Sequence, residues 1–318
     1  MNILILSVGT RNKLVQYFKK ELQGEGTVVA TDCNNLAPGL YDADRFYIVP
    51  RITEKNYLDI ILDICEKENI KAVFSLIDPE LSLISKNKER FLEIGVTPIV
   101  SDYEQIELCF NKYNMYKFLR DNNIKTAKTY ISKEEFYNDL NKGGINFPVF
   151  VKPVTGSCSV NTNKVNNVEE LEMLFSNYDD LIIQEYMNGI EYDADVYIDM
   201  ISNKVIEIFT KEKISRTAGE TYKTVSMKDE KLYDIIKNFL KKSNFKGIID
   251  IDVFKVNNEY YISEVNPRFG GIYPHSYECG MNVPRMIINN LKQISNEENI
   301  GNYNQGLYML KYHEIKII

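Results

Sequence analysis

The 318-residue sequence contains no tryptophan, only two histidines, and no long apolar or basic run. Because no stretch approaches the length of a bilayer span, we expect no membrane partner. A net charge of -7 and the absence of a Lys/Arg stripe argue against a nucleic-acid partner. Aromatic residues make up 12% of the chain and are dispersed, which indicates packing in the core and not stacking on bases.

The cysteines of the sequence do not form a recognisable disulfide, zinc or catalytic pattern. The chain has five cysteines, an odd number, and no C-x-x-C spacing, which disfavours a disulfide framework and a zinc site. Cys158 has no histidine nearby in the sequence that would make it a thiolate nucleophile. The opening MNILILSVGT lacks the basic region and the small-residue cleavage site of a signal peptide, so we expect a cytoplasmic protein.

The first hundred residues alternate strand and helix patterns. Apolar runs predict strands at 2–8, 27–32, 71–77 and 96–102, and helical spacing predicts helices at 12–22 and 57–70. This alternation is typical of a parallel, doubly wound sheet. The turn at Gly9 to Lys13 lacks the three-glycine fingerprint, so we expect no independent dinucleotide site there.

Beyond residue 102 the pattern changes. Two helical segments, 103–110 and 112–123, lead into a series of short strands that follow one another directly. Tight turns at 202–203 and 257–258 indicate antiparallel sheets. We therefore predict an α/β plus α+β chain with three units: residues 1–108, 109–189 and 190–318.

The stretch YYISEVNPRFGG places three polar side chains at alternate positions, namely Glu264, Asn266 and Arg268. Side chains two apart on a strand share a face, so these groups should converge. A carboxylate and an amide oxygen suit Mg²⁺, and an arginine beside them suits an oxyanion. Asn-Pro followed by Gly-Gly is equally consistent with an ordinary turn.

Two further stretches carry candidate binding groups. Residues 147–161 form a strand bearing Lys152 and a loop of small, hydroxyl-rich residues that would let backbone N–H groups approach a polyphosphate; a plain hairpin is the alternative. Residues 181–196 join two strands through an Asn-Gly turn, where backbone groups could face an adenine edge and Glu191 could accept from ribose hydroxyls; the alternative is a surface hairpin.

Residues 247–268 form a hairpin in which both strands bring polar groups to one face. Asp250 and Asp252 share a side of the first strand, as Glu264 and Asn266 do on the second. Carboxylates so placed repel one another unless a cation neutralises them, and a divalent metal that also holds the phosphates of ATP would do so. A solvated acidic face is the alternative.

These motifs, in this order, resemble the ATP-grasp superfamily, and particularly one ATP-binding half of the carbamoyl-phosphate synthase large subunit. The similarity spans nearly the whole chain: LILSVGTRN and PELSLI resemble its pre-ATP-grasp domain, and VKPVTGS, QEYMNGIEY, RTAGE and EVNPRFGG its nucleotide and metal motifs. The chain departs from the family at Asn111, where an acid is common, and at Cys158 in the phosphate loop. The fold implied is a Rossmann-like domain followed by antiparallel-sheet lobes that enclose ATP.

The resemblance also implies roles for individual residues. The cofactors implied are ATP and Mg²⁺, with Mn²⁺ as an alternative ion. The metal ligands would be Asp252, Glu264 and Asn266, with Asp250 as an alternative to Asp252. The groups at the reacting phosphoryl and the acceptor would be Arg216, Glu220 and Arg268. The nucleotide contacts implied are Lys112, Lys152, Gly156, Gln184, Glu185 and Met187 (the last two through their backbone), and Glu191.

The activity implied is ATP-dependent ligation of a small-molecule carboxylate to an amine through an acyl phosphate. Two alternatives remain: phosphorylation of bicarbonate or carbamate, as in carbamoyl-phosphate synthase, and nucleotide binding without turnover by a sensor. The resemblance also makes a homodimer a possible assembly.

Overall fold

The structure, a computed structural model, describes residues 1–156, 162–217 and 219–318. Its N-terminal unit is a five-stranded parallel sheet in the order β3-β2-β1-β4-β5. In chain order its elements are β1 (Asn2–Leu6), α1 (Asn12–Leu22), β2 (Val28–Asp32), the 3-10 helix η1 (Pro38–Asp42), β3 (Arg45–Ile48), α2 (Tyr57–Lys67), β4 (Ile70–Ser75), α3 (Asp78–Lys86), α4 (Lys88–Glu93) and β5 (Thr97–Pro98).

Strand β1 explains why helices cover both faces of this sheet. Its residues are apolar and alternate in direction, so Ile3 and Ile5 belong to one core cluster with α1, while Leu4 and Leu6 belong to another with α2, α3 and α4. The first cluster continues into the rest of the molecule. The N-terminal unit therefore shares a core with the C-terminal sheet.

Two helices, α5 (Tyr103–Phe110) and α6 (Lys112–Asp121), lead from the N-terminal unit to a small four-stranded sheet. This sheet has the order β6-β9-β7-β8, and its paired strands are antiparallel. We call the unit the lid lobe; it contains β6 (Thr129–Tyr130), α7 (Lys133–Asn141), β7 (Val149–Pro153), β8 (Asn163–Val165), α8 (Val168–Asn177) and β9 (Leu181–Glu185). Buried residues of α7, α8 and the strands form its separate core.

The C-terminal unit is built on an antiparallel sheet of six strands in the order β14-β13-β10-β11-β12-β15, here called the large sheet. Its strands are β10 (Ile190–Ile198), β11 (Val205–Thr217), β12 (Glu220–Met227), β13 (Gly247–Val256), β14 (Glu259–Asn266) and β15 (Tyr308–Leu310). The helices that accompany them are α9 (Glu230–Leu240), α10 (Tyr273–Glu278) and α11 (Val283–Leu291).

The two faces of the large sheet differ sharply in chemistry. On one face, Ala194, Val196, Ile249 and Ile251 are buried and cluster with the apolar residues of α9. The opposite face carries the acids of β10, β13 and β14, because polar and apolar residues alternate along these strands. We call it the polar face, and most of the candidate site lies on it.

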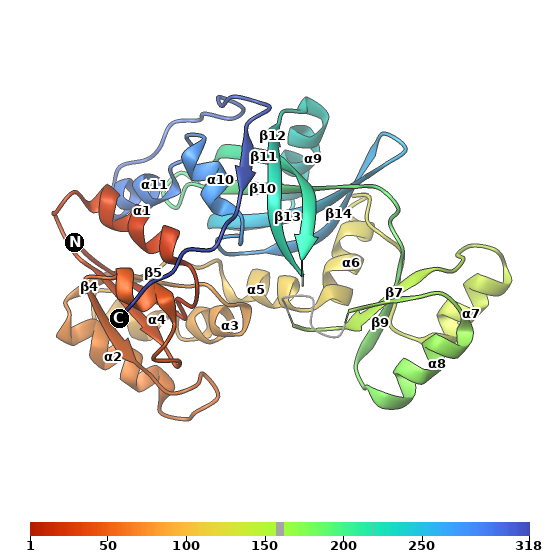
Figure 1. The fold of residues 1–318 in the computed structure, drawn as a ribbon, viewed down its shortest axis with the longest axis horizontal. Coiled ribbons are helices and arrows are strands. Elements are labelled where there is room, and N and C mark those ends of the chain that lie inside the picture. Colours follow the sequence, from red (N-terminus) through yellow and green to blue (C-terminus); the bar gives the residue numbers. More distant parts are fainter. Residues whose placement is uncertain (157–161, 218) are drawn as a thin grey trace.

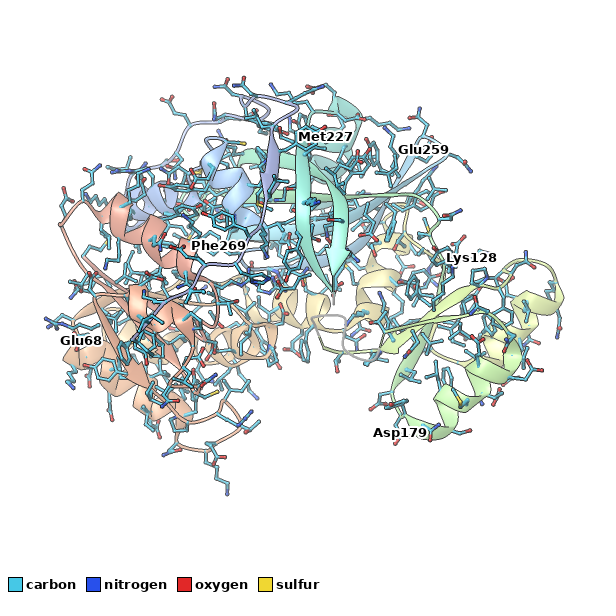
Figure 2. All side chains as sticks on the ribbon, in the orientation of Figure 1. Glu68, Lys128, Asp179, Met227, Glu259 and Phe269 are labelled. Carbon is cyan, nitrogen blue, oxygen red and sulfur yellow. The ribbon has the colours of Figure 1, made fainter. Side chains whose placement is uncertain are left out.

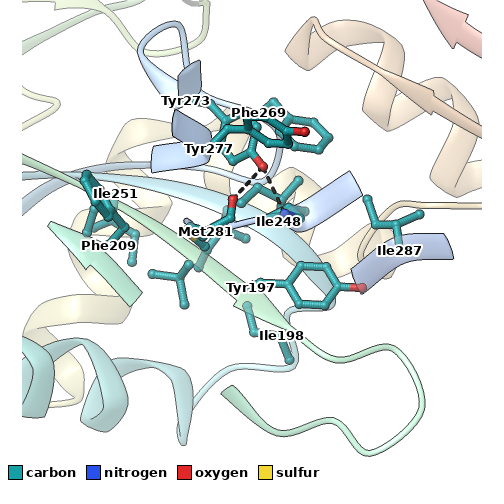
Figure 3. Packing of buried hydrophobic residues seen from close by; sticks show 14 of the residues in the cluster. Tyr197, Ile198, Phe209, Ile248, Ile251, Phe269, Tyr273, Tyr277, Met281 and Ile287 are labelled. Carbon is teal, nitrogen blue, oxygen red and sulfur yellow. Dashed lines mark hydrogen bonds between the residues drawn. The ribbon is translucent and has the colours of Figure 1, made fainter. Parts of the chain in front are cut away.

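Figure 1 shows how the units are arranged. The N-terminal unit and the lid lobe lie at opposite ends, with α5 and α6 between them and the large sheet alongside. Figure 3 shows the core beneath α10, where the Tyr273 hydroxyl donates to the Met281 carbonyl (2.9 Å) and accepts from the Val283 N–H (3.0 Å). No helix among the described residues is long and apolar enough to cross a membrane.

The predicted fold class is confirmed: a parallel N-terminal sheet is followed by antiparallel sheets. The predicted turns also form, since Asn203, Asn257 and Asn258 all adopt positive φ angles of 49° to 63°. The strand predicted at 96–102 is shorter than expected, because only Thr97 and Pro98 pair with β4.

Candidate active site

The hairpin of β13 and β14 sets the predicted metal ligands opposite one another. Asp252 pairs with Glu264, and Asp250 pairs with Asn266, whose Nδ2 donates to Asp250 Oδ2 at 3.3 Å. Directly opposed residues of antiparallel strands share a face, so the four side chains lie together on the polar face. Carboxylate and amide oxygens form a hard donor set, which fits Mg²⁺.

Two lysines from β11 accompany these acids. Lys213 forms an ion pair with Asp252 and lies 3.6 Å from Asp193. Lys211 is fully buried, forms ion pairs with Asp193 (2.7 Å) and Asp195, and donates to Ser276 at 3.1 Å. Burial alone lowers the pKa of Lys211, but the two carboxylates raise it above its usual value, so the lysine stays charged.

Of the acids in this buried network, the sequence predicted a role for Asp250 but not for Asp193 or Asp195. Asp193, Asp195 and Asp250 have carboxylate oxygens within 4.8 Å of one another. The alternation of Asp in EYDADV is the signal that could have found Asp193 and Asp195. Lys211 and Lys213 form ion pairs with Asp193 and Asp195. We therefore interpret this group as a network of ion pairs that supports the site.

Lys152 reaches the site from β7 in the lid lobe. Val149 and Val151 point into the core of that lobe, so Phe150 and Lys152 face the other way. Burial lowers the pKa of Lys152, while the carboxylates of Glu264 and Asp252 act to raise it. Lys152 of the lid lobe therefore interacts electrostatically with Glu264 and Asp252 of the large sheet.

The predicted phosphate contacts Lys112 and Gly156 lie together. The Lys112 ammonium donates to the Gly156 carbonyl, and its backbone N–H donates to the Val154 carbonyl at 2.9 Å. Gly156 has a φ of 107°, a conformation that L side chains rarely adopt. Cys158 lies outside the described residues.

The predicted adenine contacts sit at the end of β9. Gln184 is buried and donates to the Thr129 hydroxyl at 3.0 Å. The Glu185 N–H donates to the Lys128 carbonyl at 2.8 Å, and the Met187 carbonyl accepts from Gly189 at 3.1 Å. Phe150, which pairs with Gln184 and packs on Tyr186 with ring centroids 5.5 Å apart, was not predicted. Its alternation with Val149 and Val151 is the sequence signal for it.

Arg216 and Glu220 lie near the tip of the β11–β12 hairpin. Arg216 pairs with Glu191 at 2.5 Å, and Glu220 lies 3.6 Å from Lys311. In this structure they thus contact partners other than Arg268, although the resemblance groups all three at the reacting centre.

Arg268 joins the large sheet to the N-terminal unit. Its Nε lies 3.0 Å from Asp78 Oδ1, and its terminal nitrogens reach Asp78 Oδ2 (3.4 Å), the Asn266 side-chain oxygen (3.2 Å) and the Phe269 carbonyl (3.2 Å). Phe269, labelled in Figure 2, packs on Phe74 of β4 and Tyr273 of α10, with ring centroids 5.5 Å and 4.8 Å away. This packing fixes the backbone beside Arg268.

A pocket lies between α3, α5 and the end of β14, here called the cleft pocket. Its polar lining comprises Asp78, Gly156, Glu264 and Asn266. Its apolar lining comprises Leu81, Ile106, Cys109, Phe110, Val265 and Pro267. Burial raises the pKa of the Cys109 thiol well above its usual value, as expected where little water is present. The pocket therefore offers charged groups in largely apolar surroundings.

Fold and site together define a protein in which a small antiparallel lobe that carries Lys152 accompanies a large antiparallel sheet with acids on one face. A family model for the ATP-grasp domain matches residues 109–272, and one for the PylC-like N-terminal domain matches residues 3–99. The chain belongs to the ATP-grasp family.

Several known proteins are similar to this chain. The arginine-specific carbamoyl phosphate synthase large chain of Geobacillus stearothermophilus is 25% identical over 249 residues, which is 73% of this chain and 22% of that protein. The coenzyme gamma-F420-2:alpha-L-glutamate ligase of Methanocaldococcus jannaschii is 24% identical over 202 residues, 60% of this chain and 69% of that ligase. This chain therefore spans less than a quarter of the synthase.

Solved structures share the fold. The biotin carboxylase domain of the Hydrogenobacter thermophilus 2-oxoglutarate carboxylase, in complex with MgADP, ADP and bicarbonate, superposes with a TM-score of 0.78 at 15% identity. The alignment covers 96% of this chain and 73% of that one. At 15% sequence identity, this structural similarity shows a shared fold and nothing about function.

Proposed function

We propose that this chain is an ATP-dependent carboxylate–amine ligase, which forms an amide or peptide-like bond through an acyl phosphate and releases ADP and phosphate. The observation that carries the proposal is the pairing of Asp252 with Glu264 on the polar face. The carboxylates of both residues also act to raise the pKa of Lys152 in the lid lobe. Membership of the ATP-grasp family supports it.

The nucleotide would lie between the lid lobe and the polar face. Lys112 and Lys152 would hold its phosphates, and the backbone of Gly156 would approach them closely. Beside Gln184, the adenine would meet the backbone of Glu185 and Met187, and the ribose hydroxyls would meet Glu191. Because Glu191 pairs with Arg216 in this structure, nucleotide binding would rearrange that ion pair.

Mg²⁺ would be held by Asp252, Glu264 and Asn266, and it would supply positive charge against the phosphate oxygens. A carboxylate oxygen of the substrate attacks the γ-phosphorus of ATP, and ADP leaves. Lys152 and Arg268 would stabilise the negative charge that develops in this step. An amine then displaces phosphate from the acyl phosphate, so no protein nucleophile is needed.

The experiment is to measure ADP release from Mg²⁺-ATP across a matrix of carboxylates and amines. Release that requires one member of each class supports the ligase. Release that depends on bicarbonate supports the second candidate, phosphorylation of bicarbonate or carbamate, which the similarity to carbamoyl phosphate synthase favours. Nucleotide binding without release under any condition would contradict both, and formation of AMP would contradict the acyl-phosphate route.

A further inference from the structure

Asp78 is the carboxylate that the N-terminal unit contributes to the cleft pocket. It is the first residue of α3 and lies in the same pocket as Glu264 and Asn266, which belong to the large sheet. Only 13% of its side chain is exposed, and it is ion-paired with Arg268. None of the roles assigned above uses this carboxylate.

The contact between Asp78 and Arg268 is asymmetric. Asp78 Oδ1 accepts from Arg268 Nε at 3.0 Å, while Oδ2 is 3.4 Å from the nearest terminal nitrogen. A carboxylate oxygen can accept more than one hydrogen bond, so Oδ2 has capacity for a second donor. Arg268 also contacts Asn266 Oδ1, the Phe269 carbonyl and, at 4.0 Å, Asp250 Oδ2, so Asp78 is not its only anchor.

The surroundings favour a cation beside Asp78. The apolar lining includes Leu81, Ile106 and Phe110, and an ion pair is stronger where little water screens it. The other acid of the lining, Glu264, is assigned to the metal. Asp78 is thus the carboxylate of this pocket that remains for a positively charged substrate.

We propose that Asp78 is a catalytic residue that binds the ammonium group of the amine substrate in the cleft pocket, so that this substrate is a primary amine that is protonated in solution. The inference rests on the proposed ligase function. As the amine reacts, one proton passes from the ammonium to the Asp78 carboxylate and the nitrogen attacks the acyl carbon. The C–N bond forms, the bond from that carbon to the phosphate oxygen breaks, and the second proton leaves with phosphate.

Hydroxylamine separates binding of the ammonium from formation of the acyl phosphate. It is largely unprotonated near neutral pH and traps acyl phosphates as hydroxamates without an ammonium site. The assay supplies Mg²⁺-ATP, a pool of amino acids and dicarboxylic acids, and either hydroxylamine or the amine found by the substrate matrix. It compares the wild type with Asp78→Asn and Asp78→Glu.

For Asp78→Asn we expect a rise in the KM for the amine of about 10- to 100-fold, the usual effect of losing one charge-assisted hydrogen bond. The loss of hydroxamate formation should be smaller, because Arg268 keeps its contacts with Asn266 and Phe269. Asp78→Glu should recover part of the lost amine binding because it keeps the charge. The matched control is Asp59→Asn, which removes an exposed acid paired with Arg90 in the same unit and should change neither rate.

Equal losses of hydroxamate and amide in Asp78→Asn would show that Asp78 acts only through Arg268, and would overturn the inference. So would unchanged kinetics with both nucleophiles. If the wild type forms no hydroxamate with any carboxylate, the proposed ligase function fails, and this inference fails with it. Failure of this inference alone differs from that result, because the wild type then still forms hydroxamate.

Discussion

We predict that Lys152 of the lid lobe contacts the phosphates of ATP. Replacing it with methionine keeps the length of the side chain and removes the charge, so we expect kcat to fall by about 100- to 1,000-fold. ADP release at saturating Mg²⁺-ATP measures this. Lys133→Met is the matched control, because Lys133 pairs with Glu172 of α8 and belongs to the same lobe. A similar loss in both variants would contradict the role of Lys152.

Glu207 on β11 provides a test of pH dependence away from the site. The side chain is 1% exposed, and burial raises its pKa to about 8. Between its unfolded pKa, near 4.3, and this value the folded state binds the extra proton, so stability falls as pH rises, by about 1 kcal/mol per pH unit.

Glu207→Gln removes this titration and still offers an oxygen to Asn299, which donates to Glu207 at 3.3 Å. Its stability relative to the wild type should therefore improve steadily from pH 5 to about pH 8. Urea unfolding midpoints at several pH values measure the difference. If the urea midpoints of the two proteins change with pH in the same way, burial does not raise the pKa of Glu207.

At the level of secondary structure, the sequence predicted most strands of the large sheet because each is a periodic run bounded by turn residues. It also predicted that Asp252 and Glu264 share a face, since both positions follow from strand parity. It did not predict the ion pairs of Lys211 and Lys213, because which strands become neighbours depends on packing.

The same limit applies to Asp78, whose partner Arg268 is 190 residues away in the chain. The sequence places Asp78 directly after a predicted strand at 71–77 but does not show which part of the molecule it faces. The predicted roles of the site residues, and the domain boundaries, therefore stay predictions.

The loop after β14 approaches β13 very closely at Gly270. A Cβ there would lie 2.7 Å from Asp250 Oδ1, whereas a Cβ on Gly271 would lie 3.5 Å from its nearest neighbour, Arg11. We expect Gly270→Ala to lower the free energy of unfolding by about 1–3 kcal/mol, the usual cost of overpacking, and Gly271→Ala to lower it much less. Denaturant unfolding of the two variants measures this. Equal costs would mean that Asp250 moves aside freely.

For the whole molecule, a nucleotide that binds between the lid lobe and the large sheet should stabilise the folded state. Mg²⁺-ADP at about 100 times its Kd would add about 2.7 kcal/mol to the free energy of unfolding. In Glu264→Gln, ADP alone should stabilise as in the wild type, but the further gain from Mg²⁺ should shrink because a metal ligand has lost its charge. Thermal unfolding with and without EDTA measures both effects. An unaltered Mg²⁺ gain would remove Glu264 from the metal site.

The division of the large sheet into an apolar and a polar face has a consequence for how this chain can evolve. Side-chain direction alternates with every residue, so deleting a single residue at the start of β13 would turn Ile249 and Ile251 toward the polar face and Asp250 and Asp252 toward α9. Most substitutions on these strands alter one group, whereas a change in strand length reverses all of them together. Insertions and deletions should therefore be confined to the connecting turns among functional homologues.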